Sequence, residues 1–363
     1  MMEKVILFWL MQIPGIGSVT IRRLYERFGS FEALFNIEER QLFEEKLLSE
    51  TECERLKKAK EYFKRQEERY HTLLERGIQF ITEQEEKYPK RLKPLWDRPA
   101  ALFVKGSLPS DEKPSAAIVG SRNCSYYGSE MAEYFGRKLA ERGIQIISGL
   151  ALGVDSAGHR GAIQANGFTY GVLGCGITTC YPTENFMLYE EISEKGGILS
   201  EYAPGVKPCA GNFPARNRII SGLSDVVLVM EAKEKSGALI TADFAMEQGK
   251  EIFALPGRIT ERLSKGCNEL IRNGAGILVS EEDILDFFSL KYEKKINVYE
   301  KRINGLANPQ KMLYSFLDSE PKYLEEIVKG TGMTVSDCLS GLMELELQGY
   351  IIQTANLYYI KKS

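Results

Sequence analysis

The sequence predicts an α/β fold: a Rossmann-like, doubly wound and mostly parallel sheet between a helical N-terminal domain and a C-terminal winged helix. Glycine gives the first indication, because 24 of the 33 glycines fall between Pro99 and Leu290. In that stretch short apolar runs alternate with segments of helix length, whereas both flanks show the spacing of helices. We therefore expect domains at 1–98, 99–290 and 310–363, with a linker at 291–309.

The central strands are expected at six apolar runs, which are 116–119, 144–147, 170–173, 198–199, 226–230 and 251–255. Continuous apolar strands that alternate with helices indicate a parallel sheet buried on both faces. Right-handed crossovers follow, and they bring the carboxyl ends of the strands to one edge of the sheet. The loops at that edge are where a ligand is expected.

The N-terminal domain is expected to consist of short helices. Its apolar start, MMEKVILFWLMQIPGIG, has one lysine and lacks a small-residue cleavage site, so we interpret it as a buried first helix and not as a signal peptide. Residues 50–76 are densely charged, with apolar residues at helical intervals. Pro89, Pro94 and Pro99 then mark the end of the domain.

The C-terminal domain is expected to form helices at 310–318, 324–331 and 335–348, followed by a β-hairpin whose turn contains Thr354 and Asn356. This is the arrangement of a winged helix. The third helix contains glutamates and no lysine or arginine, so its charge opposes docking in a DNA groove. We therefore expect a partner-contact or regulatory role for this domain.

Composition excludes several classes of protein. The chain has 363 residues, of which 44% are hydrophobic and 27% are charged, so it is neither disordered nor fibrous. Its apolar runs are too short to cross a membrane. The seven cysteines form no CxxC pair and only two histidines are present. We expect reduced thiols in a cytoplasmic protein, with no metal site and no cofactor.

Charge narrows the kind of anion-binding site that is possible. The formal charge is −3, and residues 99–290 contain 18 basic against 23 acidic side chains. A diffuse basic coating of the histone type is therefore excluded. Binding of nucleic acid would have to depend on a few arginines and backbone amides gathered in one pocket.

The loop after the first central strand contains Gly120, Ser121 and Arg122, and a helix is expected from Ser129. Such a unit places backbone N–H groups and a helix N-terminus where they favour an anion, and an arginine adds a fork suited to phosphate. The loop lacks the GxGxxG pattern and no acidic residue ends the second strand, so NAD binding in the usual mode is not expected. A tight turn with a surface arginine is the simpler alternative.

Two later loops contain side chains that could take part in catalysis. In SGLALGVDSAGHRGAI, Asp155 and His159 are one helical turn apart and could form an acid–base pair. Because no nucleophile or metal cluster lies beside them, capping and packing are the favoured roles. Cys175 and Cys180 follow the third strand, and nothing nearby indicates a lowered pKa, so we interpret them as structural thiols.

The run NFPARNRIISGLS is the richest in hydrogen-bond donors. It places Arg216, Asn217 and Arg218 at the start of a helix, and Phe213 offers a ring on which a base could stack. An ion-paired helix start is the alternative interpretation. We favour an anion site.

Two further loops complete the predicted edge. Gly237 and Thr241 lie at a helix start that follows the fifth strand, and Arg258, Lys265 and Asn268 follow the sixth. If the sheet gathers all of these loops, their basic side chains suit several phosphates in a row better than one.

Six sequence blocks resemble one family, the DprA or Smf family of bacterial DNA-processing proteins. In chain order they are GSRNCSYYG, SGLALGVDSAGHRGAI, GCGITTCYPTEN, FPARNRIISGLS, SGALITADFAMEQGKEIFALPG and SKGCNELIRNGA. The N-terminal PGIG segment, Pro14 to Gly17, is similar to the turn of a helix-hairpin-helix or SAM-like module, which the family has at its N-terminus. The C-terminal winged helix is similar to the variable terminal domain of the family.

The resemblance implies a protein that is not an enzyme. It would bind single-stranded DNA without sequence preference, protect it and load the RecA recombinase onto it during natural transformation or DNA processing. It would also dimerise through the Rossmann-like domain. The DNA contacts that the resemblance implies are Gly120, Ser121, Arg122, Arg216, Asn217 and Arg218, with Lys265 and Asn268 as further candidates.

Two other functions stay open at this point. Phosphoribohydrolases of the lysine decarboxylase-like type share the general layout, but they have a PGGxGT loop with a catalytic glutamate, where this chain has SGALIT and Leu255-Pro256-Gly257. A scaffold that binds a free nucleotide as a regulator is the third possibility.

Overall fold

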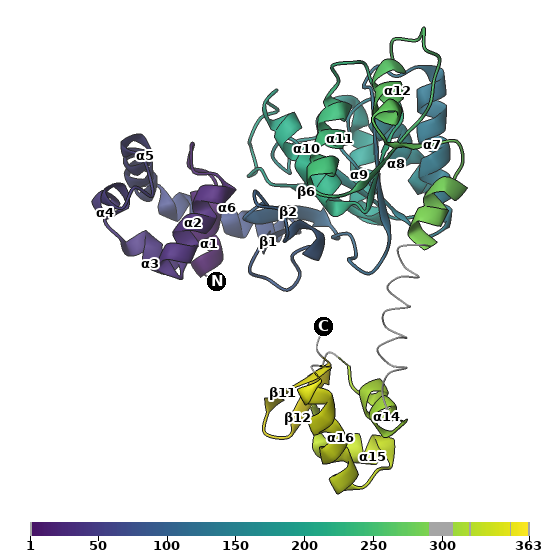
Figure 1. The fold of residues 1–363 in the computed structure, drawn as a ribbon. Helices are drawn as coiled ribbons and strands as arrows, with labels where there is room; N and C mark the ends of the chain where they lie inside the picture. Colours follow the sequence, from purple (N-terminus) through teal and green to yellow (C-terminus); the bar gives the residue numbers. More distant parts are fainter. Residues whose placement is uncertain (1, 290–307, 319–320, 349, 362–363) are drawn as a thin grey trace. The chain divides into compact units, whose positions relative to one another are not determined.

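A computed structural model describes residues 2–289, 308–318, 321–348 and 350–361. The chain divides into two compact units, Met1–Ile284 and Leu285–Ser363 (Figure 1). The first unit contains the N-terminal helices and the large sheet. The predicted linker at 291–309 lies almost entirely outside the described residues.

The N-terminal part of the first unit is helical, as the charge and spacing pattern predicts. Its helices are α1 (Met2–Leu10), α2 (Ser18–Phe28), α3 (Phe31–Asn36), α4 (Glu39–Glu44), α5 (Glu50–Lys60) and α6 (Phe63–Glu75). Helix α1 is buried from Val5 to Leu10. The prediction of a buried first helix is therefore confirmed.

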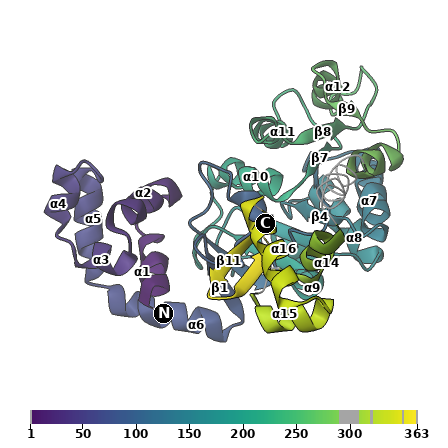
Figure 2. The same cartoon turned by 60° about the horizontal axis from the view of Figure 1, so that its bottom comes forward.

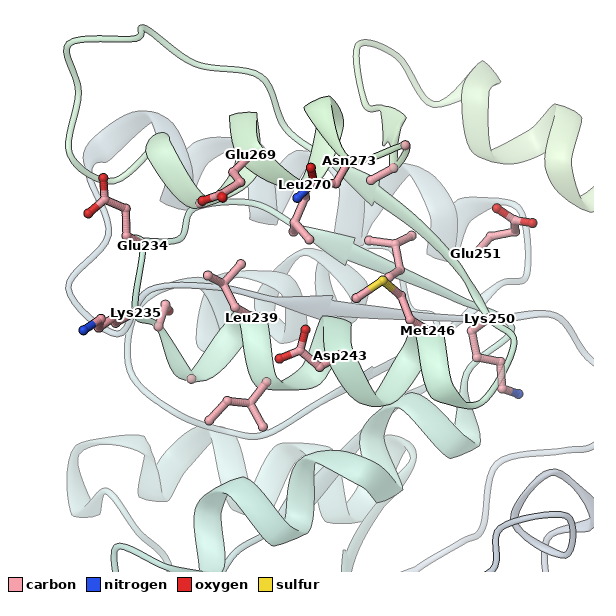
Figure 3. Close-up of a pocket in the computed structure, with 17 residues that line it drawn as sticks. Glu234, Lys235, Leu239, Asp243, Met246, Lys250, Glu251, Glu269, Leu270 and Asn273 are labelled. Atoms are coloured by element: carbon pink, nitrogen blue, oxygen red, sulfur yellow. The ribbon is translucent and has the colours of Figure 1, made fainter.

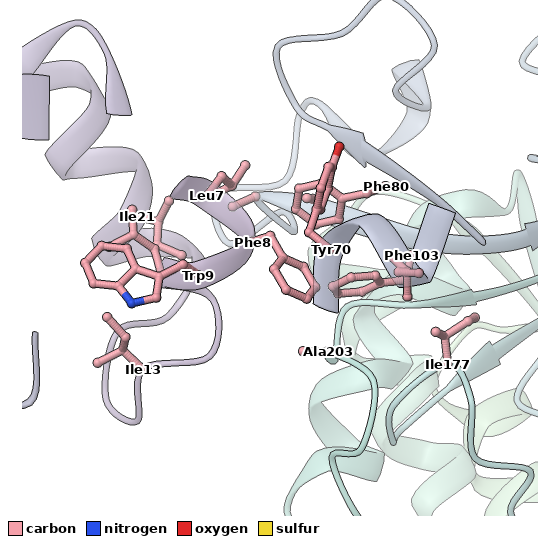
Figure 4. Close-up of a cluster of buried hydrophobic side chains, with 14 of the residues drawn as sticks. Leu7, Phe8, Trp9, Ile13, Ile21, Tyr70, Phe80, Phe103, Ile177 and Ala203 are labelled. Atoms are coloured by element: carbon pink, nitrogen blue, oxygen red, sulfur yellow. The ribbon is translucent and has the colours of Figure 1, made fainter. Parts of the chain in front are cut away.

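An aromatic cluster joins these helices to the sheet (Figure 4). The Phe8 ring of α1 lies 5.5 Å from the Tyr70 ring of α6 and 5.9 Å from the Phe103 ring of the sheet, in edge-on contacts. Aromatic contacts of this kind contribute beyond the area they bury. Ile177 and Ala203, from two loops of the sheet domain, belong to the same core cluster. The N-terminal helices and the sheet therefore share one core.

The large sheet has nine strands in the order β1-β2-β6-β5-β4-β3-β7-β8-β9. Their bounds are β1 (Ile78–Thr82), β2 (Ala101–Gly106), β3 (Ser115–Val119), β4 (Gln145–Ser148), β5 (Thr169–Leu173), β6 (Gly197–Ser200), β7 (Val226–Val229), β8 (Glu251–Ala254) and β9 (Gly276–Ile277). The strands from β6 to β9 in this order pair in parallel. All six predicted strands are present, and the Rossmann-like sheet is confirmed.

Strand order reverses at β3, which pairs with β4 on one side and with β7 on the other. A reversal of this kind opens a crevice at the carboxyl ends of the strands, and ligands of open α/β sheets bind there. The cause is that right-handed crossovers place successive helices on opposite faces on the two sides of the reversal. The functional site is therefore expected beyond the ends of β3 and β7.

Two strands at one end of the sheet were not predicted. Strand β1 pairs with β2, and β2 pairs with β6, both in the antiparallel sense. The sheet thus begins at Ile78, on the N-terminal side of the predicted boundary at residue 98. Pro89, Pro94 and Pro99 lie in the connection between the two strands, so they interrupt a hairpin and do not separate two folds.

Six helices flank the central strands, and they are α7 (Tyr126–Glu141), α8 (Val154–Gln164), α9 (Phe186–Lys195), α10 (Asn212–Leu223), α11 (Gly237–Glu247) and α12 (Lys265–Arg272). Helices α7 and α8 approach each other closely because glycines face across their contact. A Cβ atom at Gly136 would meet the Gly158 carbonyl oxygen at 2.3 Å, which no side chain could tolerate.

The second unit is a winged helix, as predicted (Figure 2). It comprises α14 (Asn308–Phe316), β10 (Lys322–Tyr323), α15 (Leu324–Thr331), α16 (Val335–Leu347), β11 (Ile351–Ala355) and β12 (Tyr358–Lys361), with sheet order β10-β12-β11. It has its own core, which includes Leu313, Ile327 and Leu342. The turn of its hairpin lies at Asn356 and Leu357, so the predicted position of Thr354 in the turn is wrong: Thr354 belongs to β11.

Candidate nucleic-acid interface

A cavity of about 880 Å³ opens beyond the carboxyl ends of β3 and β7. It brings together eight residues that the sequence predicted, from three separate segments: Gly120, Ser121, Arg122, Phe213, Arg216, Asn217, Gly237 and Thr241. We call it the central pocket. Its position is the one that the reversal of strand order predicts.

The central pocket is strongly cationic although the domain around it is acidic. Its basic side chains are Arg122, Lys207, Arg216, Lys233 and Lys235, and among the described residues that line it Asp155 is the one acidic side chain. All of the basic side chains except Arg216 are exposed. Since no ion pair within the described part of the chain involves those exposed cations, their charges are available to a ligand.

Arg122, Phe213 and Tyr181 stack on one another in the wall of the central pocket, and we call them the ladder. The Arg122 guanidinium carbon lies 4.9 Å from the centre of the Phe213 ring, within the range of a cation–π contact. The Tyr181 ring is stacked on the Phe213 ring at a centroid distance of 5.5 Å and an interplanar angle of 28°. Tyr181 is exposed, so its ring is accessible to a base. The ladder combines a phosphate donor with a stacking surface.

The floor of the central pocket is a buried guanidinium. Arg216 is only 4% exposed, and its Nη1 donates to the carbonyl oxygens of Gly149, at 2.7 Å, and Val172. Its Nε donates to Asn217 Oδ1 at 3.2 Å. Burial lowers the pKa of Arg216 to about 10, so the group remains a cation at neutral pH. It supplies a fixed positive charge that cannot move out to solvent.

The negative charge of Asp155 compensates the positive charge of Arg216. Its carboxylate accepts hydrogen bonds from the Gly149 and Ala151 backbone N–H groups at 3.1 and 3.4 Å. Burial raises the pKa of Asp155, and the positive charge of Arg216 opposes that rise. A Cβ atom at Gly149 would lie 2.6 Å from the Arg216 guanidinium, so the close approach of the two charged groups requires glycine there.

The structure corrects the expected role of the α7 N-terminus. The helix begins at Tyr126 and not at Ser129, and its first turn is capped inside the protein. The Ser125 backbone N–H and hydroxyl both donate to the carboxylate of Glu231, at 2.8 and 2.5 Å. A buried carboxylate therefore occupies the place where a phosphate was expected. Sequence analysis missed Glu231, although a single acidic residue after the apolar run VVLVM was a signal.

Helices α10 and α11 present their N-termini to the central pocket instead. Phe213 and Pro214 of the first turn of α10 line it, and so do Ser236 and Gly237 at the start of α11. The Ser236 side chain accepts a hydrogen bond from the Ala238 backbone N–H. The partial positive charge of two helix N-termini adds to the field of the basic side chains.

Three predicted residues lie elsewhere and have structural partners. Arg218 is buried and forms ion pairs with Asp97 at 3.0 Å and Glu201 at 2.8 Å. Lys265 pairs with Glu234 at 3.2 Å. The Asn268 side chain exchanges two hydrogen bonds with the backbone of Gly257. For Arg218, the alternative of an ion-paired helix start describes its surroundings better than an open anion site.

The acid–base pair that the sequence left open does not form. His159 Nδ1 lies 2.6 Å from Thr169 Oγ1, and the Asp155 carboxylate accepts from backbone amides instead. The histidine is fully buried, which lowers its pKa to about 3 and keeps the ring neutral. Burial raises the pKa of Cys175 to about 11, so this thiol is not activated as a nucleophile.

Several residues of the central pocket were missed at the sequence level: Asn123, Tyr181, Lys207, Lys233 and Lys235. The last two directly follow β7, so their place after a predicted strand was a usable signal. Lys207 lies in the long connection between β6 and α10, which has no regular pattern from which its direction could be inferred.

The described residues contain neither a metal-binding cluster nor a membrane-spanning helix. Among the described residues, no group of three or more His, Cys, Asp or Glu side chains is arranged to hold a metal ion. No helix in the part of the chain that the structure describes is long and apolar enough to span a bilayer.

Comparison with known proteins places the chain. The model of the DNA recombination-mediator protein A family matches residues 79–289, and that of the DprA winged helix domain matches residues 301–356. Protein Smf of Synechocystis sp. is 32% identical over 98% of both chains. DNA processing protein DprA of Streptococcus pneumoniae is 45% identical over 55% of this chain and 71% of its own.

Two solved structures support the same relationship. The X-ray structure of DprA from Streptococcus pneumoniae covers 78% of this chain and 97% of its own, with a TM-score of 0.69 and 34% identity. The structure that describes the single-stranded DNA binding mode of DNA processing protein A from Helicobacter pylori covers 59% of this chain and 97% of its own, with a TM-score of 0.53 and 34% identity. The chain therefore belongs to the DprA/Smf family of DNA-processing proteins.

Proposed function

We propose that the protein binds single-stranded DNA without sequence preference in the central pocket. The observation that supports this most directly is the ladder of Arg122, Phe213 and Tyr181 beside exposed cations that form no ion pair with the described residues. Arginine and lysine side chains neutralise backbone phosphates, and accessible rings stack on bases of any identity. The Helicobacter pylori relative, whose solved structure concerns single-stranded DNA binding, supports the same function.

The chemistry of the central pocket favours a single strand over a duplex. The Tyr181 ring can stack only on a base that is not already stacked between its neighbours in a helix. The exposed cations and rings of the central pocket suit phosphates and base faces better than the base edges that are read in a major groove. Affinity would therefore come from phosphates and stacking, and both are independent of sequence.

A salt series with two variants tests this proposal. Binding of fluorescent oligo-dT, followed by anisotropy, should weaken as salt rises, with a log–log slope of about −0.7 for each neutralised phosphate. Arg122→Ala should weaken binding and flatten the slope by about 0.7, because one phosphate contact is lost. Arg137→Ala, which removes a partly exposed arginine of α7 outside the central pocket, is the control. Affinity that does not depend on salt, or an Arg122→Ala variant that binds as wild type does, would sink the proposal.

Loading of RecA and a role in natural transformation belong to the same proposal, and the family relationship supports them. A protein of this kind would act in the cytoplasm. RecA filament formation on oligo-dT coated with single-strand binding protein measures the loading step. The expected result is faster filament growth with the wild-type protein than with Arg122→Ala, whose hold on the strand is weaker.

A homodimer through the Rossmann-like domain is also proposed. Figure 3 shows a second cavity, of about 820 Å³, between α11 and α12, with Leu239, Met246 and Leu270 on its walls. Met246 is exposed, and so are Ile277 and Val279 at the edge strand β9 and just after it. Because this surface is apolar with acidic side chains such as Asp243 and Glu269, it suits a protein contact better than DNA. Met246→Glu should shift the molar mass measured by light scattering towards the monomer.

The enzyme alternative receives no support from the residues that it would need. Asp155 is held by backbone amides, and His159 is buried and neutral. Incubation with nucleoside monophosphates should therefore release no free base. Turnover that disappears in Asp155→Asn would favour a phosphoribohydrolase. Competition of oligo-dT binding by a free nucleotide at equal phosphate concentration would favour the nucleotide-binding scaffold.

A further inference from the structure

A second cationic groove lies in the N-terminal domain, on the shared face of α5 and α6. Its charged and aromatic side chains recur at helical spacing through both helices, and they are Arg55, Lys58, Tyr62, Arg65 and Arg69. Spacing of three and four residues places them on one side of the helices. Trp9, Ile13 and Pro14 form the opposite wall, and the volume enclosed is about 420 Å³.

The positive charges of this N-terminal groove are not neutralised by ion pairs with the described residues. The described residues that line it include no aspartate or glutamate, and no ion pair in the described chain involves its arginines or its lysine. Arg55 donates instead to the carbonyl oxygen of Pro14 at 3.0 Å, and Arg69 donates to the side-chain oxygen of Gln66 at 3.0 Å. Glu52, whose carboxylate is influenced by the charge of Arg55, accepts hydrogen bonds from the Ser49 backbone N–H and hydroxyl.

An exposed ring lies among these charges. Tyr62 is 59% exposed in the turn between α5 and α6, and it follows Lys58 by four residues and precedes Arg65 by three. A ring flanked by unpaired cations is the same combination that the ladder of the central pocket presents. The chemistry that recognises it is a chain of phosphates with accessible bases.

A loop of the sheet domain connects the two sites. Arg69 Nη2 donates to the carbonyl oxygen of Pro204 at 3.0 Å. Three residues farther along, Lys207 lines the central pocket. Three extended residues span at most about 11 Å, and the loop is anchored because the Gly176 backbone N–H donates to the carbonyl oxygen of Val206 at 2.9 Å. One short loop therefore links Arg69 of the N-terminal groove to Lys207 on the rim of the central pocket.

We propose that a single DNA strand bound in the central pocket continues along the N-terminal groove, where its phosphates meet Arg55, Lys58, Arg65 and Arg69 and a base stacks on Tyr62. This inference rests on the proposed function and extends the binding site to a second domain. The occupant is single-stranded DNA because the charge is complementary and a short, anchored loop links the groove to the central pocket.

Two variants with the same change in net charge show whether the position of the charges in the groove matters, or only the net charge of the protein. Lys58→Glu/Arg65→Glu reverses two charges inside the groove, and Lys57→Glu/Lys64→Glu reverses two exposed lysines of the same helices outside it. Binding of the full chain to oligo-dT of about 6 and about 30 nucleotides is measured by anisotropy. Only the groove variant should lose affinity for the long oligonucleotide, by about tenfold or more, with a salt slope flatter by about 1.4. Both variants should bind the short one as wild type does.

Other outcomes of this experiment would contradict either the inference or the proposed function. Equal affinity of the two variants for the long oligonucleotide, or equal losses with both lengths in the groove variant, overturns the inference. If the wild-type chain binds neither length, the proposed function itself fails, which is a distinct result. Should the groove variant unfold, crosslinking with halogenated deoxyuridine in wild type takes its place. Tyr62 should then crosslink only to the part of the long strand that lies beyond the central pocket, and absence of that crosslink overturns the inference.

Discussion

The central pocket is better suited to bind DNA than helix α16 of the winged helix, although the winged-helix fold is the one commonly associated with DNA binding. A winged helix commonly presents such a helix to a DNA groove, yet α16 has four exposed apolar residues that recur every fourth position: Val335, Leu339, Met343 and Leu347. The central pocket lies in the most acidic part of the chain, residues 99–290, and still gathers five basic side chains. We therefore expect affinity for nucleic acid to depend on local charge and not on the fold or the net charge.

The face of α16 fits a protein partner better than DNA. Met343 is 65% exposed and Leu347 is 80% exposed, and burial of such side chains against a partner is favourable by roughly 1.5–3 kcal/mol each. Glu344 and Glu346 are on the same helix and would repel phosphates. The expectation of a partner-contact role for the winged helix stays a prediction, and the exposed apolar stripe supports it.

The largest expected effect comes from the buried charge of the central pocket, for which we find no counterpart in the described residues of the winged helix. Arg216→Ala should lower the free energy of unfolding by roughly 3–5 kcal/mol, because the buried Asp155 carboxylate then loses the cation that most strongly compensates its charge. Urea unfolding at neutral pH, followed by circular dichroism, measures the change.

The double variant Arg216→Ala/Asp155→Asn is the control for this prediction. It removes the uncompensated charge and should recover part of the lost stability. A single Arg216→Ala variant within about 1 kcal/mol of wild type would mean that the guanidinium is not needed to hold the floor together. The charge of Arg216 would then matter for ligand binding but not for the stability of the fold.

Acid should destabilise the first unit selectively. The pKa of His159 falls from its ordinary 6.5 to about 3 in the folded state, so only the unfolded chain gains that proton between these values. Stability should therefore decrease by about 1.4 kcal/mol for each pH unit below 6.5 and level off near 3. Both histidines of the chain, His71 and His159, precede the winged helix, which should lack this dependence.

His159→Asn isolates the effect. Asp155 acts in the opposite direction, because its raised pKa lets the folded state take up a proton first as the pH falls, but it is present in both proteins. The difference between the two unfolding curves therefore reports the histidine. Parallel curves from pH 7 to pH 4 would contradict a buried neutral ring.

Much of this architecture could be predicted from the sequence, and the reason is local. The six central strands are continuous apolar runs such as Val226–Val229, and glycines mark the loops that follow them. Eight of the eleven predicted site residues line one pocket because the carboxyl ends of parallel strands must meet at one edge.

What the sequence did not predict depends on partners that are distant in the chain. Arg218 and Arg216 are two residues apart on one helix, yet one meets Asp97 and Glu201 while the other faces the pocket. No spacing pattern indicates which of two neighbouring arginines will find carboxylates. The same holds for Glu231, whose carboxylate caps α7 from the end of a different strand.

Removal of the stacking ring should weaken DNA binding without changing its salt dependence. Phe213→Ala takes away the ring that contacts both Arg122 and Tyr181, so the stacking surface is lost while every charge remains. The expected loss of affinity for oligo-dT is roughly 1–3 kcal/mol, with the log–log slope unchanged. Phe168→Ala, which removes an exposed ring elsewhere in the domain, should bind as wild type. A flatter slope in Phe213→Ala would show that the ring acts by placing charges.

The smallest expected effect is the one that tests the comparison most directly. Leu339→Ser/Met343→Ser makes the exposed face of α16 polar without adding charge, and neither side chain belongs to the core of that unit. Since this face has neither cations nor accessible rings for bases, the affinity of the full chain for oligo-dT should change by less than about twofold. Binding to RecA, measured in the same preparation, is where a loss is expected if the stripe contacts a protein partner. A clear loss of DNA affinity instead would mean that an apolar, acidic helix contributes to a nucleic-acid site, and the rule that local charge decides would fail for this protein.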